Sequence, residues 1–188
     1  MLSGPNGAER INVFALVAYI SDPLRSFLVD LRRDLEPAAG PVRPHVTVLP
    51  PRPLAGPAED ACGQLEQGTR LIPGFEIELA VVEVFATTSV LYLGIGSGRD
   101  ELVHLHQILN ADGLAYQAPY PYAPHITLAQ SLALDQVDEA FHLASSRWAE
   151  FRQGRGFRVT ELTFVQNTVQ NDWLDLAIFP LRPPPTAP

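Results

Sequence analysis

The sequence has little of what marks a secreted, disulfide-linked or membrane-spanning protein. Its 188 residues include a single cysteine, Cys62, which excludes an internal disulfide and favours a reducing compartment. The first ten residues, MLSGPNGAER, contain neither a basic head followed by an apolar run nor a cleavage site. No apolar run elsewhere reaches the roughly 20 residues that span a bilayer. We therefore expect a cytoplasmic protein with no membrane partner.

The sequence also lacks the usual metal-binding and dinucleotide-binding motifs. The chain contains no H-E-x-x-H or C-x-x-C motif and no obvious set of three ligands, so we expect neither a metal nor a cofactor. The stretch GIGSGRDE at 94–101 departs from the dinucleotide-binding fingerprint, because its third glycine falls at Gly98 and Arg99 follows. A glycine-rich turn leading into a helix explains this stretch better.

Basic residues are too few for a protein that tracks along nucleic acid. The chain carries 13 basic and 21 acidic side chains, a formal net charge of −8, and affinity for a phosphate backbone comes largely from Lys and Arg. Any phosphate ligand should therefore be small or the end of a chain. The net charge does not exclude a local positive pocket, since Arg43 and Arg52 lie close in sequence to the motif described below.

Hydrophobic periodicity divides the chain into two similar successions of strands and helices. It predicts strands over 11–20, 45–49, 75–85, 90–96, 125–129, 157–166 and 173–181, and helices after the Ser-Asp-Pro at 21–23 and over 58–72, 100–114 and 135–151. This order indicates a duplicated, bilobal α+β fold in which each lobe has an antiparallel-rich sheet and flanking helices. We assign residues 10–182 to this single bilobal domain, 1–9 to a flexible N-terminus and 183–188 to a disordered proline-rich tail.

One short pattern occurs twice, as PHVTVLP at 44–50 and PHITLAQ at 124–130. With 5 His and 9 Thr in the chain, a shuffled sequence would contain about 0.05 copies of H-x-T with apolar residues at the second and fourth positions. Two copies by chance have a probability on the order of one in a thousand. A functional reason for the repeat is therefore more plausible than coincidence.

Strand geometry places the polar residues of each copy on one face. Residues i and i+2 of a strand point the same way, so His45 pairs with Thr47 and His125 with Thr127, while the aliphatic residues face the core. If the two strands face one central cleft, two imidazoles and two hydroxyls meet there. One histidine can then take a proton from an attacking water, the other can protonate the leaving oxygen, and the threonines can donate to phosphate oxygens.

These paired motifs, their spacing and the order of elements resemble the 2H phosphoesterase superfamily, in particular the 2′-5′ RNA ligase and cyclic phosphodiesterase-like proteins. The resemblance covers essentially residues 10–182. It implies a bilobal, metal-independent enzyme that acts on 2′,3′-cyclic phosphates at RNA or nucleotide ends, or on 2′-5′ linkages. Many relatives end the second motif with Arg, whereas this chain has Gln130, which removes a cationic phosphate contact.

Three further residues are candidates for substrate binding, and several alternatives stay open. Arg43 is a candidate phosphate ligand, Tyr122 a candidate platform for a nucleobase or an edge-of-core residue, and Gln130 a candidate ligand by its place in the motif. Which histidine is the base is open, with His125 favoured. We expect a monomeric hydrolase that needs no metal. The alternatives are a non-catalytic nucleotide-binding module, an enzyme that ligates RNA through 2′-5′ linkages, and a metal-dependent phosphodiesterase that a chelator would inhibit.

Overall fold

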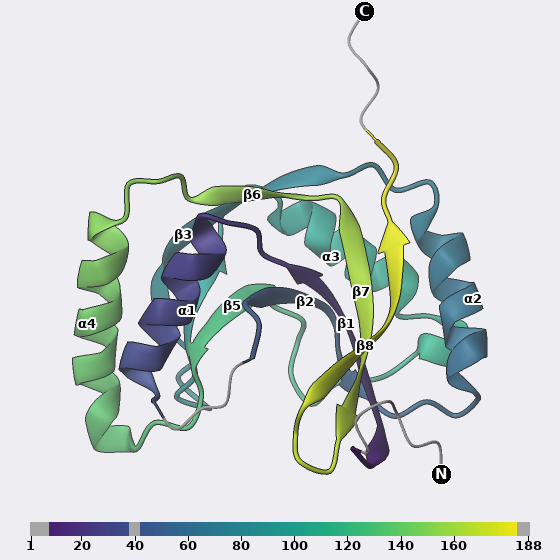
Figure 1. The fold of residues 1–188 in the computed structure, drawn as a ribbon, viewed down its shortest axis with the longest axis horizontal. Coiled ribbons are helices and arrows are strands. Elements are labelled where there is room, and N and C mark those ends of the chain that lie inside the picture. The colour runs from purple at the N-terminus through teal and green to yellow at the C-terminus, as the bar shows by residue number, and fades with distance from the viewer. Residues whose placement is uncertain (1–7, 38–41, 184–188) are drawn as a thin grey trace, which may run out of the picture.

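The computed structural model describes residues 8–37 and 42–183 (Figure 1). Most of the predicted flexible N-terminus and disordered tail, at 1–7 and 184–188, falls outside the described residues. The elements in chain order are β1 (Arg10–Tyr19), α1 (Leu24–Leu35), β2 (His45–Arg52), α2 (Ala58–Thr69), β3 (Phe75–Val84), β4 (Leu91–Ile95), α3 (Arg99–Leu109), η1 (Asp112–Leu114), β5 (His125–Ala129), η2 (Leu134–Gln136), α4 (Val137–Glu150), β6 (Gly156–Val159), β7 (Glu161–Thr168) and β8 (Trp173–Pro180).

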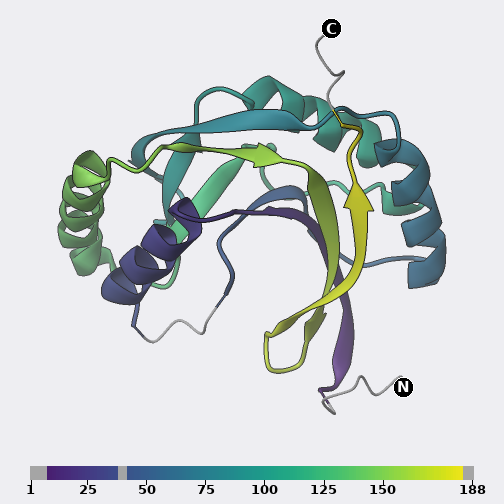
Figure 2. The same cartoon turned by 45° about the horizontal axis from the view of Figure 1, so that its top comes forward.

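The strands form two antiparallel four-stranded sheets, in the orders β2-β1-β7-β8 and β5-β4-β3-β6. This confirms the predicted α+β fold with two sheets and flanking helices. The first sheet is strongly curved (Figure 2). Each sheet ends at one edge in a strand that carries an H-x-T motif.

The two sheets are not built from separate halves of the chain. The run 157–166 was predicted as one strand, but it divides at Thr160 into β6 of the second sheet and β7 of the first. The prediction failed because Val159 and Leu162 are both buried, so the apolar pattern continues across the point where the chain changes sheets. Consequently β7 and β8, which come last in the chain, complete the sheet that β1 begins.

The helices are exchanged between the sheets in the same way. Helix α1 packs on β5 and α4 beside the second sheet, whereas α3 packs on β2 and α2 on β8 of the first sheet (Figure 1). The buried residues of α1 recur at three- and four-residue intervals and are Leu24, Leu28, Leu31 and Leu35. Thus each motif strand is backed by a helix from the other half of the chain.

The helix predicted over 100–114 is shorter than expected. Helix α3 ends at Leu109, where the side chain of Asn110 bonds both the amide nitrogen and the carbonyl of Tyr116. These bonds favour a compact turn over further helix, because an Asn side chain competes for the backbone groups that a helix would use. At the other end, Gly98 caps α3 with φ 84°, which confirms the predicted glycine-rich turn into a helix.

A large apolar core joins both sheets to their helices, and a smaller one lies apart from it. The large core includes the fully buried Leu16, Leu65 and Leu93. The small cluster of Ala15, Val17 and Val165 is packed by Tyr19 and Trp173. Since Val17 pairs with Thr47 and Tyr19 with His45 across β1 and β2, this small cluster shares the face that carries the first motif. No helix within 8–37 and 42–183 is long and apolar enough to cross a bilayer.

Candidate active site

Each H-x-T segment opens the edge strand of its sheet. His45 is the first residue of β2 and His125 is the first residue of β5. In both strands the histidine and the threonine are half-buried, whereas the residue between them, Val46 or Ile126, is 0% exposed. This alternation matches the one that the sequence predicts, and it leaves both polar side chains of each motif on the face away from the core.

The structure brings the two motifs together. Strands β2 and β5 lie side by side although they belong to different sheets. The charge of His125 acts on His45 and lowers the pKa of the latter. The two imidazoles are thus close enough for their charges to interact.

The two imidazoles are held in the same way. The Nδ1 of His45 is 2.8 Å from the carbonyl oxygen of Arg43, and the Nδ1 of His125 is 2.8 Å from that of Ala123. A carbonyl oxygen only accepts, so Nδ1 carries the proton and donates it in both cases. In the neutral imidazole this leaves Nε2 as the nitrogen that can accept a proton, and in the charged form Nε2 can deliver one. The geometry therefore prepares each ring for acid or base chemistry through Nε2.

Burial lowers the pKa of both histidines below the ordinary value of 6.5. In each ring the hydrogen bond to the backbone carbonyl opposes this effect, because it stabilises the charged form. His45 experiences two further positive influences, from Arg32 and from His125, and both lower its pKa. Of these two charges, that of Arg32 acts on His45 alone and so favours the neutral state of that ring.

Aromatic rings surround each histidine. Tyr19 meets His45 edge to face at 6.4 Å between ring centroids. On the other side, His125 contacts Phe85 and Tyr92 at 5.0 and 5.3 Å, and these two rings stack on each other at 4.0 Å. Such surroundings fix the imidazole planes and provide flat apolar surface beside them.

Arg43 lies at the site and already has partners. Its guanidinium carbon sits 3.5 Å from the centroid of the Tyr19 ring, and its Nη1 donates to the carboxylate of Asp175 on β8 at 2.9 Å. The Tyr19 hydroxyl donates to the same carboxylate at 2.7 Å. Arg43 is exposed and adjacent to the first motif, so it stays a candidate phosphate ligand, but Asp175 balances its charge.

Tyr122 is engaged in a contact between the two motifs. Its ring stacks on His106 of α3 with centroids 3.9 Å apart and planes 3° from parallel, and its hydroxyl donates to the carbonyl of Thr47 at 2.8 Å. The Nδ1 of His106 in turn donates to the carbonyl of Val48 at 2.8 Å. His106 is thus half-buried and bonded, although its place on a helix with polar neighbours is typical of a solvated residue. The sequence carries no local signal for this role, because the contacts join α3 to residues far from it in the chain.

The second motif ends at Gln130, whose backbone nitrogen donates to the carboxylate of Glu36 at 3.1 Å. Glu36 directly follows α1, so this bond fastens the end of β5 to the end of that helix. The hydroxyls of Thr47 and Thr127 have no hydrogen-bond partner among the described side chains and backbone groups, unlike the Tyr122 hydroxyl and the Gln130 backbone nitrogen. They are free to donate to a ligand.

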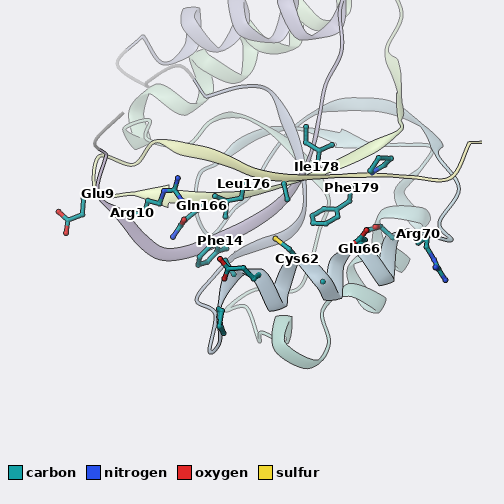
Figure 3. Close-up of a pocket in the computed structure, with 17 residues that line it drawn as sticks. Glu9, Arg10, Phe14, Cys62, Glu66, Arg70, Gln166, Leu176, Ile178 and Phe179 are labelled. Carbon is teal, nitrogen blue, oxygen red and sulfur yellow. The ribbon is translucent and has the colours of Figure 1, made fainter. Parts of the chain in front are cut away.

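A groove elsewhere on the molecule contains none of the motif residues (Figure 3). It lies between α2 and β8, where Cys62 and Glu66 face Leu176 and Phe179. Burial raises the pKa of the Cys62 thiol, which keeps it protonated near neutral pH. Within residues 8–37 and 42–183, no three His, Cys, Asp or Glu side chains gather closely enough to hold a metal ion.

The fold resembles that of several solved structures. LigT of Escherichia coli in complex with 3'-AMP superposes with a TM-score of 0.64 at 19% identity, over 93% of this chain and 98% of that one. LigT in complex with ATP gives a TM-score of 0.64 at 18% identity, over 90% and 98% of the two chains. A protein of Thermus thermophilus gives 0.60 at 18% identity, over 91% and 98%. At these identities the likeness establishes the fold.

Sequence comparison gives the family. The model of the 2'-5' RNA ligase superfamily matches residues 20–171, and the chain belongs to that superfamily. A protein of Staphylococcus aureus (strain Newman), provisionally named a phosphoesterase, is 26% identical over 102 residues, which are 53% of this chain and 60% of the relative. The match thus spans less than two thirds of that relative's length. Both findings agree with the resemblance to 2H phosphoesterases that the H-x-T motifs indicate.

Proposed function

We propose that this chain is a metal-independent phosphodiesterase, which hydrolyses the 2′,3′-cyclic phosphate of a nucleotide or an RNA end, or a 2′-5′ linkage. The observation that carries the proposal is the matched pair of imidazoles on adjacent strands, each with Nδ1 bonded to a backbone carbonyl and Nε2 left to exchange a proton. Such a pair supplies one base and one acid to the same phosphorus centre. Membership of the 2'-5' RNA ligase superfamily supports this choice of substrate.

The reaction follows from these roles. A water molecule attacks phosphorus while Nε2 of the base takes one of its protons, and the new P–O bond forms as one ester P–O bond breaks. The ribose oxygen that leaves takes its proton from Nε2 of the second, charged histidine. Thr47 and Thr127 donate to the two non-bridging oxygens, where negative charge grows in the transition state. From a 2′,3′-cyclic phosphate the product is a ribose monophosphate with a free neighbouring hydroxyl, and from a 2′-5′ linkage the phosphate stays on one nucleoside while the other leaves with the hydroxyl.

We assign the base to His45 and the acid to His125, which reverses the preference for His125 that the sequence suggested. The repulsion between the two charged rings is mutual, but the positive charge of Arg32 opposes protonation of His45 and does not act on His125. At a pH where one of the two rings is charged, the neutral one is then His45.

The substrate should be small and the protein should act as a monomer in a cytoplasmic setting. The net charge of −8 disfavours long contact with a nucleic-acid backbone. LigT carries 3'-AMP in one solved structure and ATP in another, which agrees with a nucleotide-sized ligand. A single chain supplies both histidines and both threonines, so the chemistry needs no second copy.

The test is product formation from a panel of 2′,3′-cyclic nucleotides, a cyclic-phosphate-ended oligonucleotide and a 2′-5′ dinucleotide, with chelator present, from pH 5 to pH 9. We expect chelator-resistant turnover of at least one member, with a bell-shaped profile of kcat/KM whose maximum lies on the acid side of neutrality, because both histidine pKa values are lowered. Nucleotide binding without turnover of any member would contradict the proposal and favour a binding module. Loss of turnover with chelator would favour a metal-dependent enzyme.

A further inference from the structure

Two residues at the C-terminal end of α1, Arg32 and Glu36, bond to residues that adjoin the two motif strands. Glu36 accepts from the backbone nitrogen of Gln130, just beyond β5. One helical turn earlier, Nη1 of Arg32 donates to the carbonyl of Val42 at 3.1 Å, just before β2. Residues four apart share a helix face, so Arg32 and Glu36 together bridge the approach to the first motif and the exit from the second.

The bond from Arg32 lies next to the one that orients the first histidine. The carbonyl of Val42 accepts from Arg32, and the following carbonyl, that of Arg43, accepts from Nδ1 of His45 at 2.8 Å. A shift of this short backbone segment would therefore move the imidazole. Arg32 is half-buried, and its hydrogen bond to Val42 fixes the segment from the side of α1.

We propose that Arg32 is a positioning residue of the candidate active site, which fixes the backbone ahead of His45 and places a positive charge near that ring. This inference rests on the proposed function, because the charge matters for an anionic phosphate. It adds a residue from a different element to the two motifs.

The charges around His45 single out Arg32. The charges of Arg32 on α1 and His125 on β5 act on this ring, and Tyr19 of β1 meets it edge to face. Tyr19 in turn contacts the guanidinium of Arg43 and the carboxylate of Asp175 on β8. The charge of Arg43 is balanced by Asp175 at 2.9 Å, whereas the described residues form no ion pair with Arg32. Burial lowers the pKa of Arg32, and the charge of Glu36 opposes this effect, so the guanidinium stays charged at neutral pH.

The test compares Arg32→Gln with Arg33→Gln, its neighbour in sequence, which is exposed and paired with Asp30. NMR titration of the histidine rings, assigned with the His45→Ala and His125→Ala variants, gives the pKa of each ring without any need for turnover. We expect Arg32→Gln to raise the pKa of His45 more than that of His125, whereas Arg33→Gln changes neither. Arg32→Lys, which keeps the charge, should restore most of the His45 value.

Binding of inorganic phosphate, followed by the same resonances, gives the second readout. Loss of the positive charge near His45 predicts about tenfold weaker phosphate binding for Arg32→Gln and no change for Arg33→Gln. An unchanged His45 pKa with unchanged phosphate affinity in folded Arg32→Gln would overturn the inference. The two proposals can fail separately. If the wild-type protein turns over no phosphodiester but Arg32→Gln raises the pKa of His45, the proposed enzymatic function is refuted and the positioning role of Arg32 stands.

Discussion

Replacing Tyr122 with phenylalanine removes one hydroxyl and keeps the ring that stacks on His106. The hydroxyl donates to the carbonyl of Thr47 at 2.8 Å in a partly buried setting, and no other donor reaches that carbonyl among the described side chains. A hydrogen bond of this kind contributes about 1 kcal/mol net to folding, and an unsatisfied partner adds to the loss. We expect the free energy of unfolding to fall by about 1–2 kcal/mol, which in a chain of 188 residues lowers Tm by roughly 2–8 °C.

Urea unfolding and thermal scans of Tyr122→Phe measure this loss, with Tyr120→Phe as the matched control because Tyr120 is 57% exposed. Tyr122→Ala should lose more, about 3–5 kcal/mol, since the stacked ring also disappears. If Tyr122 instead served as a nucleobase platform, the phenylalanine variant would be as stable as the wild type. The alanine variant would then raise KM with little change in stability. That pair of results would refute the structural role.

Other perturbations have outcomes of defined sign. Folding lowers the pKa values of His45 and His125, so the unfolded chain binds protons first as the pH falls from about 6.5. The midpoints of urea unfolding should therefore decrease between pH 7.5 and pH 5.5. Equal midpoints would contradict the burial of these rings. Arg52→Met should lose about 2–3 kcal/mol in urea unfolding, because Arg52 is 2% exposed and its guanidinium donates to the amide oxygen of Asn110 and to two backbone carbonyls, all of which would lose this partner. A stability equal to wild type would show that these bonds contribute nothing. Gly98→Ala should destabilise the protein by about 1–3 kcal/mol, because Gly98 has a φ of +84° and a Cβ there would lie 2.5 Å from a backbone oxygen of β3. Gly63→Ala should stabilise the protein slightly, since a Cβ at that position of α2 meets no atom within 4 Å. The reverse order of stabilities would refute the strain argument.

The parts of the fold that follow from local pattern were predictable from the sequence. The H-x-T segments alternate between buried aliphatics and half-buried polar residues, and this period of two places His45 and Thr47 on one face. The spacing of leucines likewise predicted α1, and the glycine-rich turn ahead of α3 was identified from Gly98. The pairing of the two motifs rested on their improbable repetition, and the adjacency of β2 and β5 agrees with it.

The parts that depend on long-range contacts were not predictable. The change of sheet at Thr160 leaves no mark, because buried residues continue on both sides of it. The stack of His106 on Tyr122 joins residues from α3 and a loop, and neither shows a periodic signal. The bond of Arg32 to Val42 depends on how α1 packs against β5, so it becomes visible only in three dimensions.

The central claim is that two histidines act together on one phosphorus. The most direct test is kcat for the best cyclic nucleotide of the panel, measured for the wild type, His45→Ala, His125→Ala and the control His142→Ala, whose side chain is exposed on α4. We predict at least about a hundredfold loss of kcat in each of the first two variants, with unchanged circular dichroism, and no loss in the control. Near-normal turnover by either folded motif variant would contradict the two-histidine mechanism.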